Sequence, residues 1–166
     1  IKKESNVNKR LYLLMSILFI NCNNHSPEML WKNAELMRSE KNLKECIINL
    51  ESIINKYPQH DLAAKAQFQK AEIYLNDVKD FDIAIEEFEK VIDKYPNHDE
   101  AKNSLFMIAY VYNNYLSSYT DAMDHYNLFM SKYPDDELIP SVKYELEGLL
   151  NIETTIDSLN NIVTKN

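Results

Sequence analysis

Lys56-Tyr57-Pro58, Lys94-Tyr95-Pro96 and Lys132-Tyr133-Pro134 repeat one tripeptide at a spacing of 38 residues. A fixed period of this size is typical of solenoids built from helix pairs. Because proline cannot continue a helix, each tripeptide predicts the end of one. Short arrays of such repeats usually present binding surfaces, so the spacing favours a binding protein over an enzyme.

The same period holds for the residues that precede each tripeptide. Matching positions carry similar residues: Leu43, Phe81 and Tyr119; Cys46, Ala84 and Ala122; Leu50, Phe88 and Tyr126. Their offsets follow one stripe of an α-helix. An earlier helix also repeats, since Ala66, Phe68, Ala71 and Tyr74 match Ser104, Phe106, Ala109 and Tyr112, and then Val142, Tyr144, Glu147 and Leu150. Each repeat is therefore predicted to be two helices.

The composition agrees with an all-α fold. Gly148 is the only glycine in 166 residues, whereas sheet-rich folds of this length need more glycines for their turns. We predict a tetratricopeptide-type α-solenoid of three 38-residue helix pairs plus a partial or capping fourth pair. The expected helices cover residues 27–39, 42–56, 61–77, 81–94, 99–116, 119–132, 137–150 and 152–164.

Residues 1–22 form a separate segment. A basic lead is followed by an almost wholly apolar run, Leu11–Ile20, and then by Cys22. The run is too short for an ordinary membrane-spanning helix but suits an export signal. A cysteine directly after such a run resembles the lipobox of bacterial lipoproteins, which implies lipidation of Cys22. An ordinary cleaved signal, and an uncleaved anchor or buried helix, are the other interpretations. We expect a signal at 1–22, a short tether at 23–26 and the solenoid at 27–164.

The charge balance bears on the partners. The chain has a formal net charge of −8 at pH 7, and its basic residues are partly concentrated in the lead. Phosphate backbones require clustered lysine and arginine, so nucleic acid is not an expected partner.

The repeat positions resemble those of the tetratricopeptide repeat family. The residues that carry this resemblance are best kept in the second unit: Ala66, Phe68, Ala71, Tyr74, Phe81, Ala84, Phe88 and Tyr95-Pro96. The longer unit and its Lys-Tyr-Pro ending resemble bacterial envelope lipoproteins of the BamD and CpoB (YbgF) type. That resemblance implies a non-enzymatic, membrane-anchored scaffold in outer-membrane protein assembly or Tol-Pal-linked processes. Its partners would be other envelope proteins or peptides, and its place the outer membrane, facing the periplasm. The alternative is a soluble periplasmic or cytosolic peptide-binding module.

Residues that could carry chemistry have simpler structural interpretations. His60 and His98 share one repeat position, but both fall in polar turns at helix starts, so we expect no metal. Cys46 shares the small position with alanines and is expected to be a buried free thiol. Glu86-Glu87 is interpreted as part of a solvated face. No catalytic or phosphate-binding motif is present, so we expect no enzyme activity and no cofactor.

The candidate partner-binding residues come from the first helix of each repeat. In superhelical arrays these helices usually line the concave groove, and the matching positions are Lys65, Asn103 and Ser141; Glu72 and Tyr110; Asn76 and Asn114; with Phe106 beside them. We expect Tyr110 and Asn114 to face the groove and Tyr112 to pack in the core. The region 104–116 is apolar nearly all round, so burial on several sides is the other interpretation.

Overall fold

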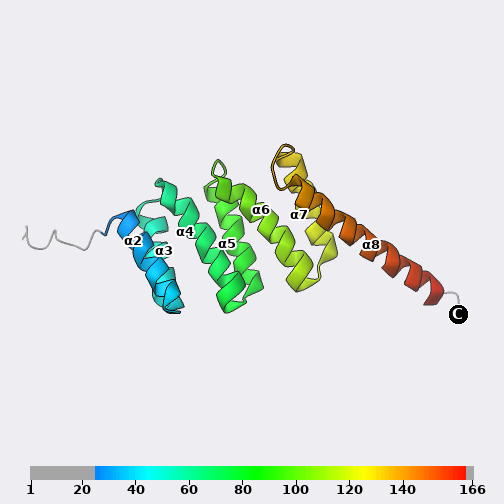
Figure 1. The fold of residues 1–166 in the computed structure, drawn as a ribbon, viewed down its shortest axis with the longest axis horizontal. Coiled ribbons are helices and arrows are strands. Elements are labelled where there is room, and N and C mark those ends of the chain that lie inside the picture. The colour runs from blue at the N-terminus through cyan, green and yellow to red at the C-terminus, as the bar shows by residue number, and fades with distance from the viewer. Residues whose placement is uncertain (1–24, 164–166) are drawn as a thin grey trace, which may run out of the picture.

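The computed structural model describes residues 25–163; the predicted signal, with Cys22, lies outside the described residues. Within that range the chain is helical and contains no strands (Figure 1). The helices are α2 (Pro27–Ser39), α3 (Leu43–Lys56), α4 (Asp61–Glu72), α5 (Phe81–Lys94), α6 (Asp99–Val111), α7 (Tyr119–Lys132) and α8 (Ile139–Val163). Two π-helical segments, η1 (Ile73–Val78) and η2 (Tyr112–Leu116), extend α4 and α6.

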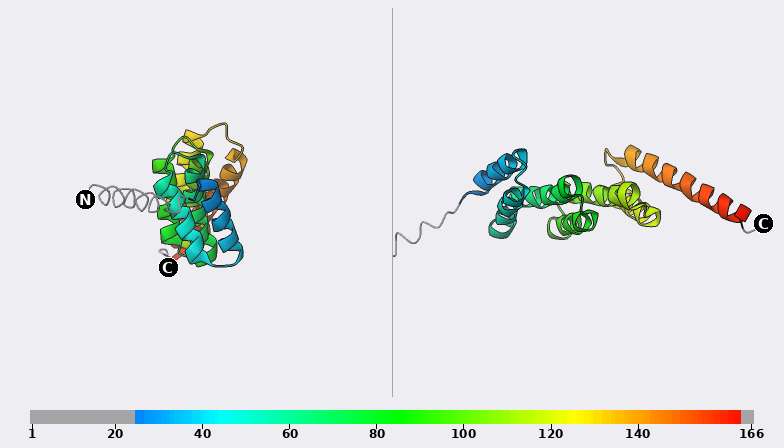
Figure 2. Two further views of the ribbon diagram at one scale, coloured as in Figure 1. Left: turned by 90° about the vertical axis from the view of Figure 1, so that its left-hand side faces the viewer. Right: turned by 90° about the horizontal axis from the view of Figure 1, so that it is seen from below.

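The helices form antiparallel pairs that follow one another along a single axis. The pairs are α2 with α3, α4 with α5, and α6 with α7, and each second helix also contacts the first helix of the next pair. Seen from below, the first helices α2, α4, α6 and α8 lie on one side and the second helices on the other (Figure 2). The predicted all-α solenoid of helix-pair repeats is confirmed.

Short polar caps start the helices. The Met29 amide donates to Ser26 Oγ at 3.3 Å, with Pro27 in the first position of α2. The Ile83 amide donates to Asp80 Oδ1 at 3.1 Å in the same way. Such caps satisfy amides that have no partner within the helix.

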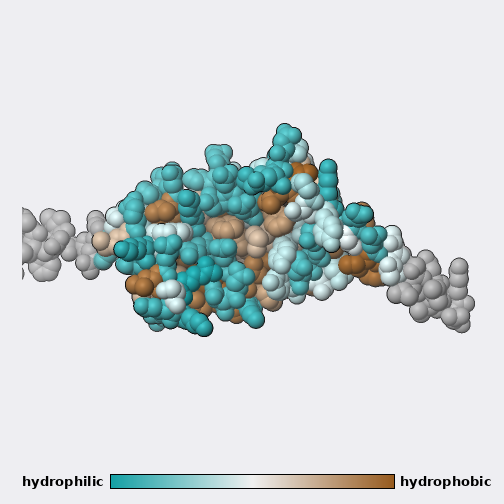
Figure 3. Space-filling view, viewed as in Figure 1, coloured by the Kyte–Doolittle hydropathy of each residue, from teal (hydrophilic) through white to brown (hydrophobic). Residues whose placement is uncertain are grey.

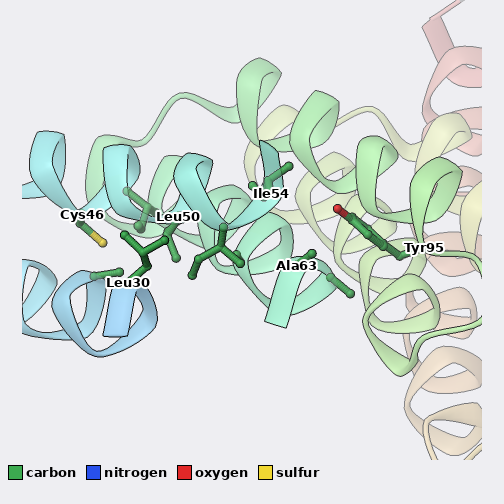
Figure 4. Packing of buried hydrophobic residues seen from close by; sticks show 11 residues of the cluster. Leu30, Cys46, Leu50, Ile54, Ala63 and Tyr95 are labelled. Carbon is green, nitrogen blue, oxygen red and sulfur yellow. The ribbon is translucent and has the colours of Figure 1, made fainter. Parts of the chain in front are cut away.

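Three apolar clusters follow one another along the solenoid. The first joins α2, α3 and the start of α4, and includes Leu30, Leu50 and Ile53 (Figure 4). The second centres on Phe88 and the third on Tyr126 and Phe129, all fully buried. Cys46 is a fully buried free cysteine, as predicted, and burial raises the pKa of its thiol. The first cluster also reaches Tyr95 at the end of α5, so the core is a chain of overlapping local units.

The turn within each repeat uses a residue in the left-handed conformation. Lys41, Lys79 and Ser117 have φ values of 60°, 62° and 52°, and they are again 38 residues apart. In the last two repeats the following amide donates to a carbonyl six residues earlier: Asp80 to Tyr74 at 2.9 Å and Ser118 to Tyr112 at 3.0 Å. Closures of this kind end helices, usually with glycine.

Two expectations from the sequence are wrong. The predicted helices 137–150 and 152–164 are one continuous helix, α8. No proline or glycine lies between Leu149 and Val163 to interrupt it, and the Thr154 hydroxyl donates to the Asn151 carbonyl at 3.0 Å within the helix.

The second error concerns Glu87, which the sequence predicts to lie on a solvated face. Glu87 is buried and only 5% exposed, whereas Glu86 beside it is exposed. Its carboxylate accepts from Gln67 Nε2 at 2.5 Å and lies 2.8 Å from Lys90 Nζ and 3.3 Å from Lys70 Nζ. A buried carboxylate needs such partners, and α4 and α5 itself supply them here.

Candidate protein-binding surface

The exposed side of α2, α4 with η1, α6 with η2, and α8 faces the viewer in Figure 1; we call it the first-helix face. Figure 3 shows it in the same orientation, with apolar patches toward its middle and further apolar patches near both ends of the described part. The predicted partner-binding residues belong to these helices. Lys65, Asn76, Asn114 and Ser141 are exposed, while Glu72, Asn103, Phe106 and Tyr110 are partly buried.

Tyr110 and Asn114 lie close together at the end of α6. The Tyr110 ring meets the edge of the Tyr115 ring with centroids 6.0 Å apart. Asn114 Nδ2 donates to the Tyr110 carbonyl at 3.0 Å, so part of its amide is used within the helix. Tyr112 packs against the second and third clusters, and its ring lies 5.3 Å from that of His125 on α7. Tyr110 and Tyr112 are both partly buried, but only Tyr112 packs on the clusters.

Phe106 packs within its own repeat. Its ring lies 5.8 Å from Tyr126 and 6.2 Å from Phe129, both on α7. The matching Phe68 packs on Phe88 of α5 in the same manner, at 5.3 Å. This position therefore holds the two helices of a repeat together, and Phe106 is a poor choice for a partner-binding residue.

The N-terminal part of the first-helix face carries charged groups. Arg38 of α2 and Asp77 of η1 form an ion pair with an N–O distance of 3.0 Å. Burial raises the pKa of Glu72, with Asp77 adding to the rise and Arg38 opposing it. These charges join the first two repeats, and Met29 and Leu36 of α2 are exposed apolar side chains in the same part of the chain.

A hollow of about 380 Å³ lies between η2 and α8. Its lining includes Asn113, Glu145, Gly148 and Ile152, and Asn113 Nδ2 donates to Glu145 Oε2 at 2.9 Å across it. A β-carbon added to Gly148 would meet no atom within 4 Å, so this helix position is open to a ligand. Tyr144, Glu147, Leu149 and Asn151 complete the lining, so apolar side chains and polar groups both face the hollow, as in many binding sites.

The sequence prediction missed Asn113, Glu145, Gly148 and Ile152, although the 38-residue period points to two of them. Gly148 holds the fourth-unit position of Glu72 and Tyr110, and Ile152 that of Asn76 and Asn114. Extending those two series by one more period finds them. Asn113 and Glu145 occupy other positions, and their pairing appears only in the structure.

Tyr126 lies in the core beside this region. Its side chain is fully buried, and within residues 25–163 its hydroxyl has no hydrogen-bond partner. Burial raises its pKa strongly, and the charges of Glu145 and Tyr110 contribute less. The phenol is therefore neutral at physiological pH.

The histidines at the helix starts have structural contacts. His60 Nδ1 accepts from the Leu62 amide at 3.2 Å, and His60 Nε2 lies 3.2 Å from Glu28 Oε1. The His98 ring meets the Tyr95 ring edge-on at 5.9 Å. Within the described part of the chain, no three histidine, cysteine or acidic side chains are grouped to hold a metal ion.

Together, the fold and this surface define a helical-repeat protein of tetratricopeptide type, suited to binding other proteins. The sequence matches the family described as soluble NSF attachment protein, SNAP, over residues 12–148. The chain belongs to this family, which is one of helical adaptors and not an enzyme class. The match includes most of the apolar run, Leu11–Ile20. No curated protein matches the sequence.

Proposed function

We propose that this protein is an adaptor that holds an apolar segment of a partner protein on its first-helix face. The hollow between η2 and α8 is the observation that carries this proposal. It combines an apolar side chain, Ile152, with the open backbone at Gly148 and the amide–carboxylate pair Asn113–Glu145. The family description, which names attachment to another protein, supports the same role.

The chemistry of the hollow favours a peptide or helix as the ligand. Tyrosines are frequent among residues that dominate binding energy, and Tyr144 lies in the lining of the hollow. Amide and carboxylate groups at the rim can bind main-chain groups of an extended segment. The open position at Gly148 permits close approach of a partner's backbone.

A pair of charge insertions tests the surface. Ile152→Asp should reduce partner capture from a cell extract at least about tenfold, because it places an unpaired charge in an apolar contact. Leu128→Asp is the matched control, since Leu128 is similarly exposed but lies on α7, a second helix. Circular dichroism should show both variants folded. Equal capture by both variants would contradict the proposal.

The predicted signal at residues 1–22 supports a finer proposal. A lipid on Cys22 would hold the adaptor on a membrane of the bacterial envelope, among BamD- or CpoB-like assemblies. The supporting features are the basic lead, the apolar run and the cysteine. Within residues 25–163, no helix combines the length and apolar character needed to cross a bilayer. Cys22→Ser should abolish acyl labelling and release the protein from membranes. A wild-type protein whose intact mass includes no acyl group would exclude this anchor.

A further inference from the structure

The first helix of the fourth unit, α8, is not followed by a second helix within the described part of the chain. In the second unit, Phe68, Ala71 and Tyr74 face α5, and in the third, Phe106, Ala109 and Tyr112 face α7. The fourth unit has Tyr144, Glu147 and Leu150 at these positions. We call this side of α8 the open side.

The open side exposes large apolar side chains. Tyr144 is 76% exposed and Leu150 is 53% exposed, whereas their counterparts in the second and third units are partly buried. The opposite side of α8 is packed normally, since Val142 and Leu149 are buried in the third cluster. The rotation of α8 therefore matches that of α4 and α6, and within residues 25–163 no second helix covers its open side.

The open side adjoins the hollow of the first-helix face, because Tyr144 and Glu147 also line the hollow. Leu150 lies outside that lining, about 160° around the helix from Ile152, given 3.6 residues per turn. The two surfaces therefore share an edge, and Leu150 belongs to the open side alone.

Charge at one position defines the chemistry of a helix that would cover the open side. The residues that match Glu147 in the second and third units are Ala71 and Ala109. Both alanines are fully buried against the second helix of their unit. Phe68 packs on Phe88, so in the antiparallel pair Ala71 lies at the level of Ala84. A helix bound on the open side would place against Glu147 the residue that corresponds to Ala84. If that residue were alanine, the Glu147 carboxylate would be buried without a partner.

We propose that the open side binds an amphipathic helix of a partner protein, which carries large apolar residues and a lysine or arginine that pairs with Glu147. The bound helix completes the fourth repeat in the manner of α5 and α7. A second copy of this chain fits less well, because a two-fold contact between the open sides of two α8 helices would bring like charges at Glu147 together.

The probe is a fluorescent peptide with the α5 sequence, residues 81–94, that contains Ala84→Lys. It should bind the full chain, and nuclear magnetic resonance spectra should show saturable shifts of the amide signals of Tyr144 and Leu150 in α8. A peptide with Ala84→Glu should bind at least about tenfold more weakly. In the Glu147→Lys protein the order of the two peptides should reverse. Leu150→Ser should weaken binding of the lysine peptide but leave capture by the hollow unchanged, because Leu150 does not line the hollow, and this difference separates the two surfaces.

Three outcomes would overturn the proposal. The first is no saturable shift with the lysine peptide at millimolar concentration, where such spectra still detect weak binding. The second is an unchanged order of peptides with Glu147→Lys. The third is a wild-type dimer by sedimentation that Tyr144→Ser and Leu150→Ser abolish, since a second copy would then occupy the open side.

Discussion

Lys79 and Ser117 hold backbone conformations that glycine adopts without strain. For an L-residue the left-handed region costs about 1–2 kcal/mol, although glycine also has more freedom to lose on folding. Lys79→Gly and Ser117→Gly should therefore each stabilise the protein by about 0.5–1 kcal/mol in urea unfolding. Lys65→Gly is the control, because Lys65 is exposed inside α4 and its replacement should cost about 1 kcal/mol. Destabilisation by both turn variants would contradict this account of the turns.

Glu87 links α4 and α5 through one carboxylate. Burial acts to raise the pKa of Glu87, but hydrogen bonds from Lys90 and Gln67 and the charge of Lys70 hold it below its usual value of 4.5. An acid with a lowered pKa stabilises the fold above its unfolded pKa, and this contribution is lost as the pH falls through the folded pKa. Wild type should therefore lose more stability than Glu87→Gln between about pH 5 and pH 2. If wild type and Glu87→Gln lost the same stability over this pH range, the Glu87 carboxylate would contribute no pH dependence.

Ala84 tests the close approach of the two helices in the second repeat. Its side chain is fully buried, so Ala84→Leu should overpack the cluster and cost about 1–3 kcal/mol. Glu86→Leu is the matched control on the exposed side of α5 and should change the melting temperature little. Glu87 cannot serve as that control, because Glu87→Leu would remove the partner of two lysines. Equal effects of Ala84→Leu and Glu86→Leu would show that the repeat register is wrong.

At the scale of elements, the sequence predicted six of the helices closely and failed at the end of the chain. The Lys-Tyr-Pro periods fix the ends of α3, α5 and α7, because proline excludes alternatives. After Pro140 no such signal exists, and polar residues from Asn151 onward are compatible with either a turn or a continuing helix. The pattern also cannot tell Glu86 from Glu87, because burial of an acid depends on lysines that other positions supply.

Gly148 weakens the middle of α8, and the packing gives no reason for it. Glycine inside a helix costs about 1 kcal/mol relative to alanine, and a β-carbon here would meet nothing. Gly148→Ala should therefore raise the free energy of unfolding by about 0.5–1 kcal/mol. If a partner's backbone approaches this position, the same variant should weaken capture of that partner. Higher stability with unchanged capture would place the partner elsewhere on the first-helix face.

At the scale of the whole molecule, the three clusters predict a gradient of stability along the solenoid. In linear arrays each unit is stabilised mainly by its neighbours, so the terminal units open most easily. The middle repeat, α4 and α5, has neighbours on both sides and the buried Glu87 network within it. Hydrogen exchange should therefore be slowest in α4, α5 and the first half of α6, and faster in α2 and in α8 beyond Leu149. Leu50→Ala, which leaves a cavity in the first cluster, should accelerate exchange in α2 and α3 far more than in α7. Uniform acceleration across all helices would instead show that the solenoid unfolds as one cooperative unit.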